Sequence, residues 1–322
     1  MKVAVNEKAA LYMYKDDGPF KGLLKHWQLL LMLVPTLLYF LIFRYGPIFG
    51  IVISFQEFTP KVGNSFIESI MQSPWVGLDH FKAFFTSLNG MQIIRNTIVI
   101  SFLKIIFGFP APIILALLIN EIRNRHFKKY FQTISYLPYF ISWVILAGII
   151  RIVFSPDTGL IVDLFKALNM ETVNVLADES LFVVLLIMSD IWQAAGWGSV
   201  IYLAAISGID DQLYEAAIID GANKLKQLIH ITLPCLAPTI VVMLILRTGT
   251  ILNAGFDQIF NLYNPAVYSV GDILDTYIYR TGLESSRYSY TTAIGLFQSA
   301  IGFLMVLLTN SLAKRLGEEG IW

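Results

Sequence analysis

Six long apolar segments constrain this chain more than any other feature of its sequence. They run approximately over residues 27–55, 93–119, 131–154, 181–206, 236–255 and 291–312. Each is long enough to cross the hydrocarbon core of a bilayer, which takes roughly 20 mostly apolar residues in a helix. With 56% apolar and 14% charged residues, the chain carries more apolar surface than one soluble core can bury. The sequence therefore predicts an all-α integral membrane protein with six transmembrane helices.

The basic residues are distributed unevenly around these segments. Five lysines precede the first segment, four basic residues follow the second, two lysines follow the fourth, and two basic residues follow the last. Because Lys and Arg are enriched in cytoplasmic loops, this pattern predicts that both termini are cytoplasmic. We expect a cytoplasmic N-terminal segment (1–26), a six-helix transmembrane domain (27–312) with a cytoplasmic hairpin at 207–234, and a cytoplasmic tail (313–322).

The first apolar segment is too long for the core of a signal peptide and has no small-residue cleavage site. We therefore expect it to remain as the first span. It is longer than one straight crossing requires, and Gly46-Pro47 offers a place where its helix can bend.

Charge and composition exclude several functions. Lys and Arg total 23, as do Asp and Glu, so the net charge gives no reason to expect a nucleic acid as partner. The single Cys235 cannot form an internal disulfide, and the four scattered histidines make no ligand cluster. We expect no metal site.

The hairpin at 207–234 carries the most specific pattern in the chain. It predicts two short helices around a glycine, in which Asp210 or Asp211 caps the first helix and Gly221 lets the chain turn. We expect Pro234 to prevent the second helix from running straight into the fifth span.

The tripeptide Glu215-Ala216-Ala217 is common in helices, but here three residues, Gly221, nine residues and then Ile231-x-Leu233-Pro234 follow it. This complete pattern resembles the signature of permease subunits of ATP-binding-cassette (ABC) importers, in which the loop docks into a groove of the cytoplasmic ATPase. The resemblance implies the type I importer permease fold. It assigns ATPase coupling to Glu215, Ala216, Ala217, Asp220 and Gly221. One departure is visible, because relatives usually have Pro at the position of Asp211.

The resemblance extends over nearly the whole chain. Residues 75–81, 95–97 and 203–205 are similar to the sugar-importing branch, and residues 43–47 and 256–260 are similar to permeases for polysaccharide breakdown products. This implies a transport subunit, not an enzyme, in the bacterial cytoplasmic membrane. It would form half of the translocation pathway for a carbohydrate, an oligosaccharide released by polysaccharide breakdown.

The resemblance also implies partners and a mechanism. A second, homologous permease would complete the pathway as a heterodimer, and an extracytoplasmic solute-binding protein would deliver the sugar. Two cytoplasmic ATPases would close on ATP and open the cavity inward by alternating access. The sequence has no Gly-x-x-x-x-Gly-Lys-Ser/Thr phosphate loop, so we expect ATP and Mg on the ATPase subunits and no cofactor on this chain.

Five ionisable residues fall inside predicted spans, where an unpartnered charge costs roughly 2.5 to 3.5 kcal/mol or more. They are Arg44, Lys104, Arg151, Asp190 and Arg247. Arg44 and Arg151 lie near the outer ends of their spans and can reach the interface. Lys104 could pair with an acid on another helix. Asp190, and Arg247 near the middle of the fifth span, form the better candidate site because their spans flank the hairpin.

The candidate substrate pathway combines aromatic rings with polar side chains, which suits sugars because they present apolar faces edged by hydroxyls. Its residues are Asp190, Trp192, Gln193, Trp197, Arg247, Asn253, Asp257 and Gln258. Arg247 and Lys104 would favour acidic sugars such as uronates. Two other interpretations stay open, since Trp is common in membrane helices and Asp190 with Arg247 could be a structural ion pair.

The alternative function is a secondary sugar transporter driven by H⁺ or Na⁺, with Asp190 as the proton-binding carboxylate. Such a carrier does not need the hairpin. A membrane-embedded enzyme is disfavoured, because the chain lacks paired intramembrane Asp residues, a His cluster and a nucleophile beside a base.

Overall fold

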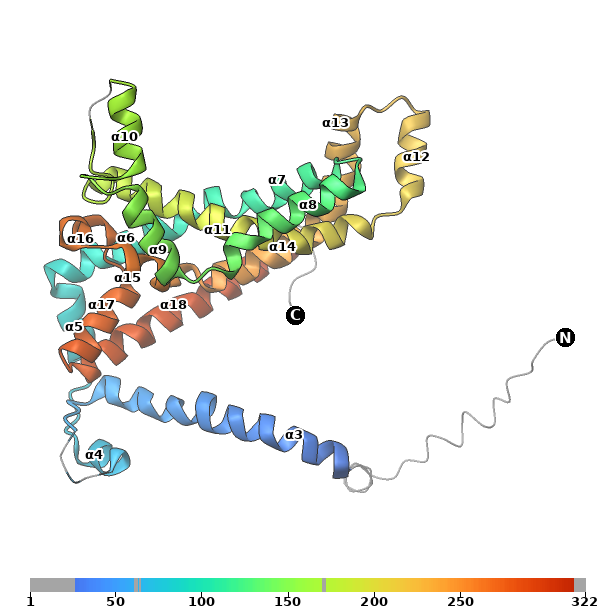
Figure 1. Ribbon diagram of the computed structural model, residues 1–322. Helices are drawn as coiled ribbons and strands as arrows, with labels where there is room; N and C mark the ends of the chain where they lie inside the picture. Colours follow the sequence, from blue (N-terminus) through green and yellow to red (C-terminus); the bar gives the residue numbers. More distant parts are fainter. Residues whose placement is uncertain (1–26, 61–62, 64, 170–171, 316–322) are drawn as a thin grey trace, which may run out of the picture. The chain divides into compact units, whose positions relative to one another are not determined.

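The computed structural model describes residues 27–60, 63, 65–169 and 172–315 (Figure 1). In this part of the chain every regular element is a helix, and the one β-type contact is an isolated bridge between Gln56 and Trp75. The predicted all-α class is confirmed. The chain divides into two compact units, residues 1–52 and 53–322, which are described separately.

The first unit contains α3 (Trp27–Phe40), a π-helical turn (Leu41–Tyr45) and most of a 3-10 helical segment (Gly46–Phe55). Residues Leu30–Phe55 form one apolar helix of 26 residues, which is long enough to cross a bilayer. At Gly46-Pro47 the helix changes its type instead of breaking. A proline suits this junction because it cannot donate the N–H that an unbroken α-helix requires.

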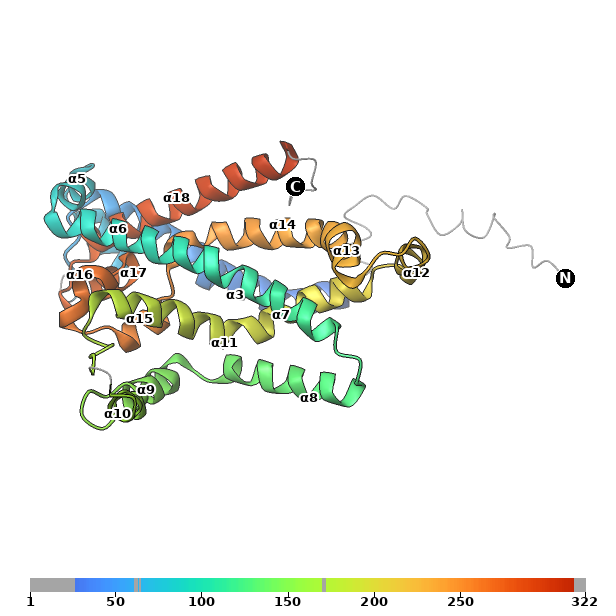
Figure 2. The same ribbon diagram turned by 90° about the horizontal axis from the view of Figure 1, so that it is seen from above.

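Four long helices span the second unit. α6 (Leu88–Leu103) and α7 (Pro110–Asn120) form one helix of 33 residues through a π-helical turn at Lys104–Gly108. α11 (Glu179–Ser207) has 29 residues and α18 (Tyr288–Arg315) has 28. The fourth helix joins α13 (Lys224–Gln227) to α14 (Leu233–Gly249) through a π-helical turn at Leu228–Thr232. α7, α11 and α14 run side by side when seen from above (Figure 2).

The predicted third span, residues 131–154, is broken. α8 (Arg125–Tyr136) with its 3-10 turn (Leu137–Phe140) meets α9 (Trp143–Val153) at 97°. Pro138 interrupts the α-helical hydrogen bonding, and the Ser142 Oγ accepts a hydrogen bond from the Ile145 N–H to start α9. The described residues thus hold five helices that can span a membrane, or six if the bent pair is one span.

The fifth span differs from the predicted range of 236–255 at both ends, because its helix runs from Lys224 to Gly249. Apolar residues alone do not mark its start, since the first two turns carry Lys224, Lys226 and His230. It ends before a 3-10 turn (Ile251–Asn253) and Gly255, whose φ is +96°.

Shorter helices occupy the connections. α5, α15, α16 and α17 gather at one end of the second unit, and the hairpin of α12 (Asp211–Ile219) and α13 lies at the other (Figure 1). The short helices are α4 (Phe66–Gln72), α5 (Asp79–Thr86), α10 (Leu160–Ala167), α15 (Phe256–Leu262), α16 (Tyr268–Gly271) and α17 (Leu274–Tyr279).

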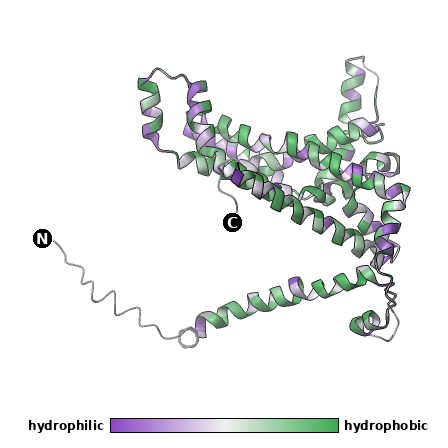
Figure 3. Ribbon diagram, turned by 180° about the vertical axis from the view of Figure 1, so that it is seen from behind, coloured by the Kyte–Doolittle hydropathy of each residue, from purple (hydrophilic) through white to green (hydrophobic). Residues whose placement is uncertain are grey.

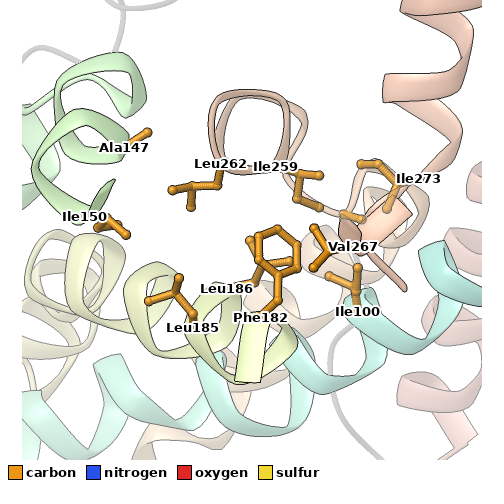
Figure 4. Packing of buried hydrophobic residues seen from close by; sticks show 11 residues of the cluster. Ile100, Ala147, Ile150, Phe182, Leu185, Leu186, Ile259, Leu262, Val267 and Ile273 are labelled. Carbon is orange, nitrogen blue, oxygen red and sulfur yellow. The ribbon is translucent and has the colours of Figure 1, made fainter. Parts of the chain in front are cut away.

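Three apolar clusters hold the second unit together. The largest joins α6, α9, α11 and α15 around Phe182, Leu186 and Ile259 (Figure 4). The second packs α7 and α11 against α14, and the third packs α6 against α17 and α18. Apolar side chains also cover much of the outer helix surface (Figure 3), as expected of helices that face lipid.

Candidate functional site

The predicted hairpin consists of α12, a turn at Gly221 and α13. The Asp210 carboxylate caps α12 by accepting a hydrogen bond of 3.0 Å from the Gln212 N–H, and Asp211 is the first residue of the helix. Gly221 has φ +75°, a backbone conformation that residues with a Cβ rarely adopt. Asn223 caps α13 in the same way, through the Lys226 N–H. Two capped helices around a glycine are confirmed.

The expectation for Pro234 is wrong, because the second hairpin helix continues straight into the fifth span. Pro234 stands in the first turn of α14, directly after the π-helical turn at Leu228–Thr232. A π-helical turn shifts the hydrogen-bond register by one residue, so the widened backbone accepts the proline ring and its missing N–H. The hairpin is thereby continuous with a membrane-spanning helix.

α12 is tied back to this helix by a side-chain contact. The Tyr214 hydroxyl lies 2.9 Å from the Thr232 hydroxyl, in the π-helical turn. The predicted coupling residues Glu215, Ala216, Asp220 and Gly221 are exposed, and Ala217 is half-buried. Ile218 and Ile219 beside them are 61% and 86% exposed. Two exposed isoleucines at the tip of a hairpin are typical of a surface that a partner covers; sequence reasoning did not single them out.

A buried polar cluster lies where α11, α15 and the α6–α7 helix meet. Lys104, the first residue of the π-helical turn, is 3% exposed and its Nζ donates to the Asp190 Oδ1 at 2.9 Å. It also donates to the Gln258 Oε1. The Gln258 Nε2 in turn donates to the Leu186 carbonyl at 2.7 Å and to the Ser189 hydroxyl at 2.8 Å. Lys104 does pair with an acid on another helix, as expected.

Arg247 approaches the same carboxylate from α14. Its Nη2 lies 3.8 Å from the Asp190 Oδ2, and its side chain is 46% exposed. The placement near the middle of the fifth span is wrong, because Arg247 lies in the last turn of α14. The helix begins earlier and ends earlier than its apolar residues suggest. Asp190 therefore stands between two cations, with Lys104 as the closer partner.

Two neighbouring cavities border this cluster. The larger has a volume of about 750 Å³, and Asp190, Asn253, Asp257 and Gln258 line it. The smaller recess has a volume of about 130 Å³, and Asp190, Arg247 and Asn253 line it. Five of the eight predicted pathway residues thus come together. The aromatic side chains of the larger cavity, which sequence reasoning missed, are Trp143, Phe256, Tyr279 and Tyr288.

The other three predicted pathway residues lie elsewhere on α11. Trp192 follows Asp190 by two residues, which places it about 200° around the helix, and it is 54% exposed. Trp197 stacks on Tyr139, with ring centroids 5.3 Å apart. Gln193 lines a third cavity, of about 640 Å³, together with Trp143 and Asp257. Their contact with a substrate stays a prediction.

A second polar group closes the larger cavity towards α18. The Gln298 Nε2 donates to the Asn253 Oδ1 at 3.1 Å and to the Asp275 Oδ1 at 2.9 Å. Burial raises the pKa of the Asp275 carboxyl, and the hydrogen bond from Gln298 offsets part of this rise. The raised pKa reduces the negative charge that Asp275 contributes to the cavity.

Arg151 donates to the Asn261 backbone carbonyl, so this arginine is satisfied without a substrate. Arg44 lies in the first unit and is exposed there. Among the described residues, no three His, Cys, Asp or Glu side chains are grouped as metal ligands.

Comparison with known proteins identifies the class to which this fold and hairpin belong. Residues 108–318 match the family described as the binding-protein-dependent transport system inner membrane component, and the chain belongs to this family. It is a membrane permease subunit of an ABC transporter with the type I fold, and not an enzyme. The predicted family and fold are confirmed, and the ion-driven alternative is not favoured.

Particular relatives are similar over almost their whole length. The polygalacturonan/rhamnogalacturonan transport system permease protein YteP of Bacillus subtilis is 45% identical, over 93% of this chain and 92% of YteP. Protein LplB of the same organism is 43% identical, over 91% of each chain. In the crystal structure of a bacterial alginate ABC transporter with an alginate pentasaccharide-bound periplasmic protein, a chain 39% identical matches with a TM-score of 0.86, over 94% of this chain and 99% of that one.

Proposed function

We propose that this permease forms half of the transmembrane pathway for an oligosaccharide that carries carboxylate groups, such as a fragment of a uronic-acid polysaccharide. The similar proteins named above support this proposal, because their names refer to polygalacturonan, rhamnogalacturonan and alginate. The arabinooligosaccharide permease AraP of Bacillus subtilis, whose name refers to a neutral sugar, is less similar at 28% identity.

The observation that carries the proposal is the surplus positive charge beside the larger cavity. Lys104 and Arg247 share one carboxylate, and Lys104 takes the shorter contact with it. The Arg247 guanidinium, 46% exposed, therefore keeps donors for another anion. An arginine binds a carboxylate through two parallel hydrogen bonds, which suits a uronate.

The rest of the cavity lining suits a sugar ring. Trp143, Phe256, Tyr279 and Tyr288 offer aromatic faces for the apolar side of a sugar, and Asn253 and Asp257 can bond its hydroxyls. We assign the substrate pathway to Asp190, Arg247, Asn253, Asp257 and Gln258, with Asp190 and Gln258 acting through their hydrogen bonds to Lys104.

The proposed assembly contains a second, homologous permease, two cytoplasmic ATPases that bind ATP and Mg, and an extracytoplasmic binding protein. The exposed isoleucines beside Glu215 and Gly221 support docking of an ATPase on the hairpin. The continuous helix from α13 to α14 supports alternating access, because a push on α12 reaches Arg247 along one rigid element.

We further propose that the membrane is the bacterial cytoplasmic membrane, with the hairpin and both termini in the cytoplasm. A contact of 3.7 Å between Lys224 and Glu121 supports this, because it joins the hairpin to the loop that carries Arg123 and Arg125. The proposed domain runs over residues 27–312. The N-terminal segment 1–26 and residues 316–322 of the tail lie outside the described residues, and α18 continues to Arg315.

The test is the substitution Arg247→Gln in the assembled transporter. We expect ATP-dependent uptake of trigalacturonate by proteoliposomes to fall about tenfold or more, because a charge-assisted hydrogen bond contributes roughly 1.5 to 3 kcal/mol. The matched control is Arg151→Gln, which removes an arginine that bonds the Asn261 carbonyl and lines neither cavity. Wild-type uptake by the Arg247→Gln variant would contradict the proposal.

A further inference from the structure

Within this proposed function, we propose that Lys104 determines substrate specificity without touching the substrate: it holds Asp190 and thereby leaves Arg247 free to bind a sugar carboxylate. The inference rests on the assignment of Arg247 to the pathway. It makes Lys104 a positioning residue that acts through Asp190.

The ammonium group of Lys104 is fully engaged by protein. It donates to Asp190 at 2.9 Å and to Gln258, and its side chain is only 4% exposed. Gln258 cannot rotate to offer its nitrogen instead, because that nitrogen already donates to the Leu186 carbonyl and the Ser189 hydroxyl. The amide oxygen is therefore fixed towards Lys104.

The backbone next to this group is shaped to receive the lysine. A Cβ at position 255 would lie 2.5 Å from the Lys104 Nζ, and Gly255 has φ +96°. The apolar cluster in Figure 4 fixes the three elements that meet here, because Ile100, Leu186 and Ile259 stand one turn or one residue from Lys104, Asp190 and Gln258. The lysine and its two partners form a rigid unit.

Arg247 depends on this unit for its freedom. Its Nη2 lies 3.8 Å from Asp190, which is beyond hydrogen-bond distance, while Lys104 holds the other carboxylate oxygen. Asp190 is only 17% exposed, so without Lys104 its charge would need another partner. Arg247 is the cation beside it. A movement of about 1 Å would make a charge-assisted hydrogen bond and occupy the guanidinium.

The recess beside Arg247 offers room for an anionic group. Its volume is about 130 Å³, and Ser101, Arg247 and Thr250 contribute to its lining. The Ser101 hydroxyl is buried and has no hydrogen-bond partner among the described residues. A hydroxyl donor and a guanidinium around one small recess suit a carboxylate, which accepts hydrogen bonds from both. If Arg247 turned to Asp190, this arrangement would be lost.

A purely structural role is the rival explanation, in which Lys104 and Asp190 only fasten two helices together. Such a role would lower the amount or stability of the protein without changing its preference between an acidic and a neutral sugar. The ratio of two affinities therefore separates the two explanations, because a general loss of folded protein leaves that ratio unchanged.

The experiment measures equilibrium binding of trigalacturonate and of its trimethyl ester to the purified permease–ATPase complex. The binding protein is omitted, so its own preference does not enter. We expect Lys104→Met to reduce the preference for the acid about tenfold, because Arg247 then pairs with Asp190. We expect the double variant Lys104→Met, Asp190→Asn to recover the preference to within about threefold of wild type, because the neutral amide introduced at position 190 no longer attracts the guanidinium.

Asp190→Asn alone keeps both cations and should retain the preference, which gives a second test if Lys104→Met does not fold. Loss of the preference in the double variant or in Asp190→Asn would overturn the inference, as would its retention in Lys104→Met. Arg247→Gln separates this inference from the proposed function. If Arg247→Gln abolishes the preference and Lys104→Met does not, only the role of Lys104 fails; if Arg247→Gln keeps the preference, the carboxylate site itself fails.

Discussion

At the scale of single residues, the polar cluster shows how far a sequence can be interpreted. Asp190 and Arg247 were predictable because a charge at bilayer depth needs a partner or water. The closer partner of Asp190 was not, because Lys104 belongs to a span 86 residues earlier. Its side chain reaches Asp190 through a π-helical turn that no sequence period reveals.

The tryptophans give the opposite lesson. Trp192 and Trp197 suited a sugar by their chemistry, but helix geometry turns Trp192 away from Asp190, and Trp197 stacks on Tyr139. The aromatic rings of the larger cavity come from α9, α15, α17 and the start of α18. Their proximity depends on tertiary packing between segments far apart in the chain, which residue type alone does not indicate.

Gly255 leads to a residue-scale prediction. In Gly255→Ala the new methyl group would displace the Lys104 ammonium from Asp190 and Gln258, and the backbone at φ +96° would be strained. We expect the melting temperature of the purified complex to fall by several degrees, measured by tryptophan fluorescence. Gly148→Ala is the matched control, since a Cβ there meets nothing within 4 Å. Equal melting temperatures for the two variants would show that Lys104 is not held as described.

At the scale of elements, the hairpin was the most predictable part of the chain. Its glycine and capping residues follow from local rules, and the structure has Asp210 as the cap and Asp211 in the first turn, a position that also favours proline. The outcome at Pro234 was not predictable, because a π-helical turn cancels the usual helix-breaking effect. The third span was misjudged for the related reason that hydropathy does not detect a bend of 97°.

The tip of the hairpin leads to an element-scale prediction. Ile219 is 86% exposed beside the predicted coupling residues, so Ile219→Ser removes apolar contact area from a docked ATPase but little from the permease core. We expect substrate-stimulated ATP hydrolysis by the reconstituted complex to fall several-fold.

The matched control for Ile219→Ser is Leu160→Ser, at a site 69% exposed on α10, away from the hairpin. If Ile219→Ser couples as well as Leu160→Ser, the tip of the hairpin does not contact the ATPase.

At the scale of the whole molecule, the class was predictable because two independent properties agree. Long apolar segments require a membrane, and the hairpin pattern is specific to one family, to which the chain belongs. The pairing of helices was less predictable, since packing in a bilayer depends on close contacts of small residues more than on hydrophobicity. Gly196 is an example, because a Cβ on α11 there would collide with the Ser135 backbone of α8.

The most direct test of the whole account is uptake of an acidic and a neutral trisaccharide by the complete transporter in proteoliposomes. We expect trigalacturonate to enter only when the binding protein is outside and ATP is in the compartment of the ATPases, and galactotriose to enter at least tenfold more slowly. Equal uptake of both sugars, or uptake of trigalacturonate driven by an ion gradient without ATP, would contradict the account.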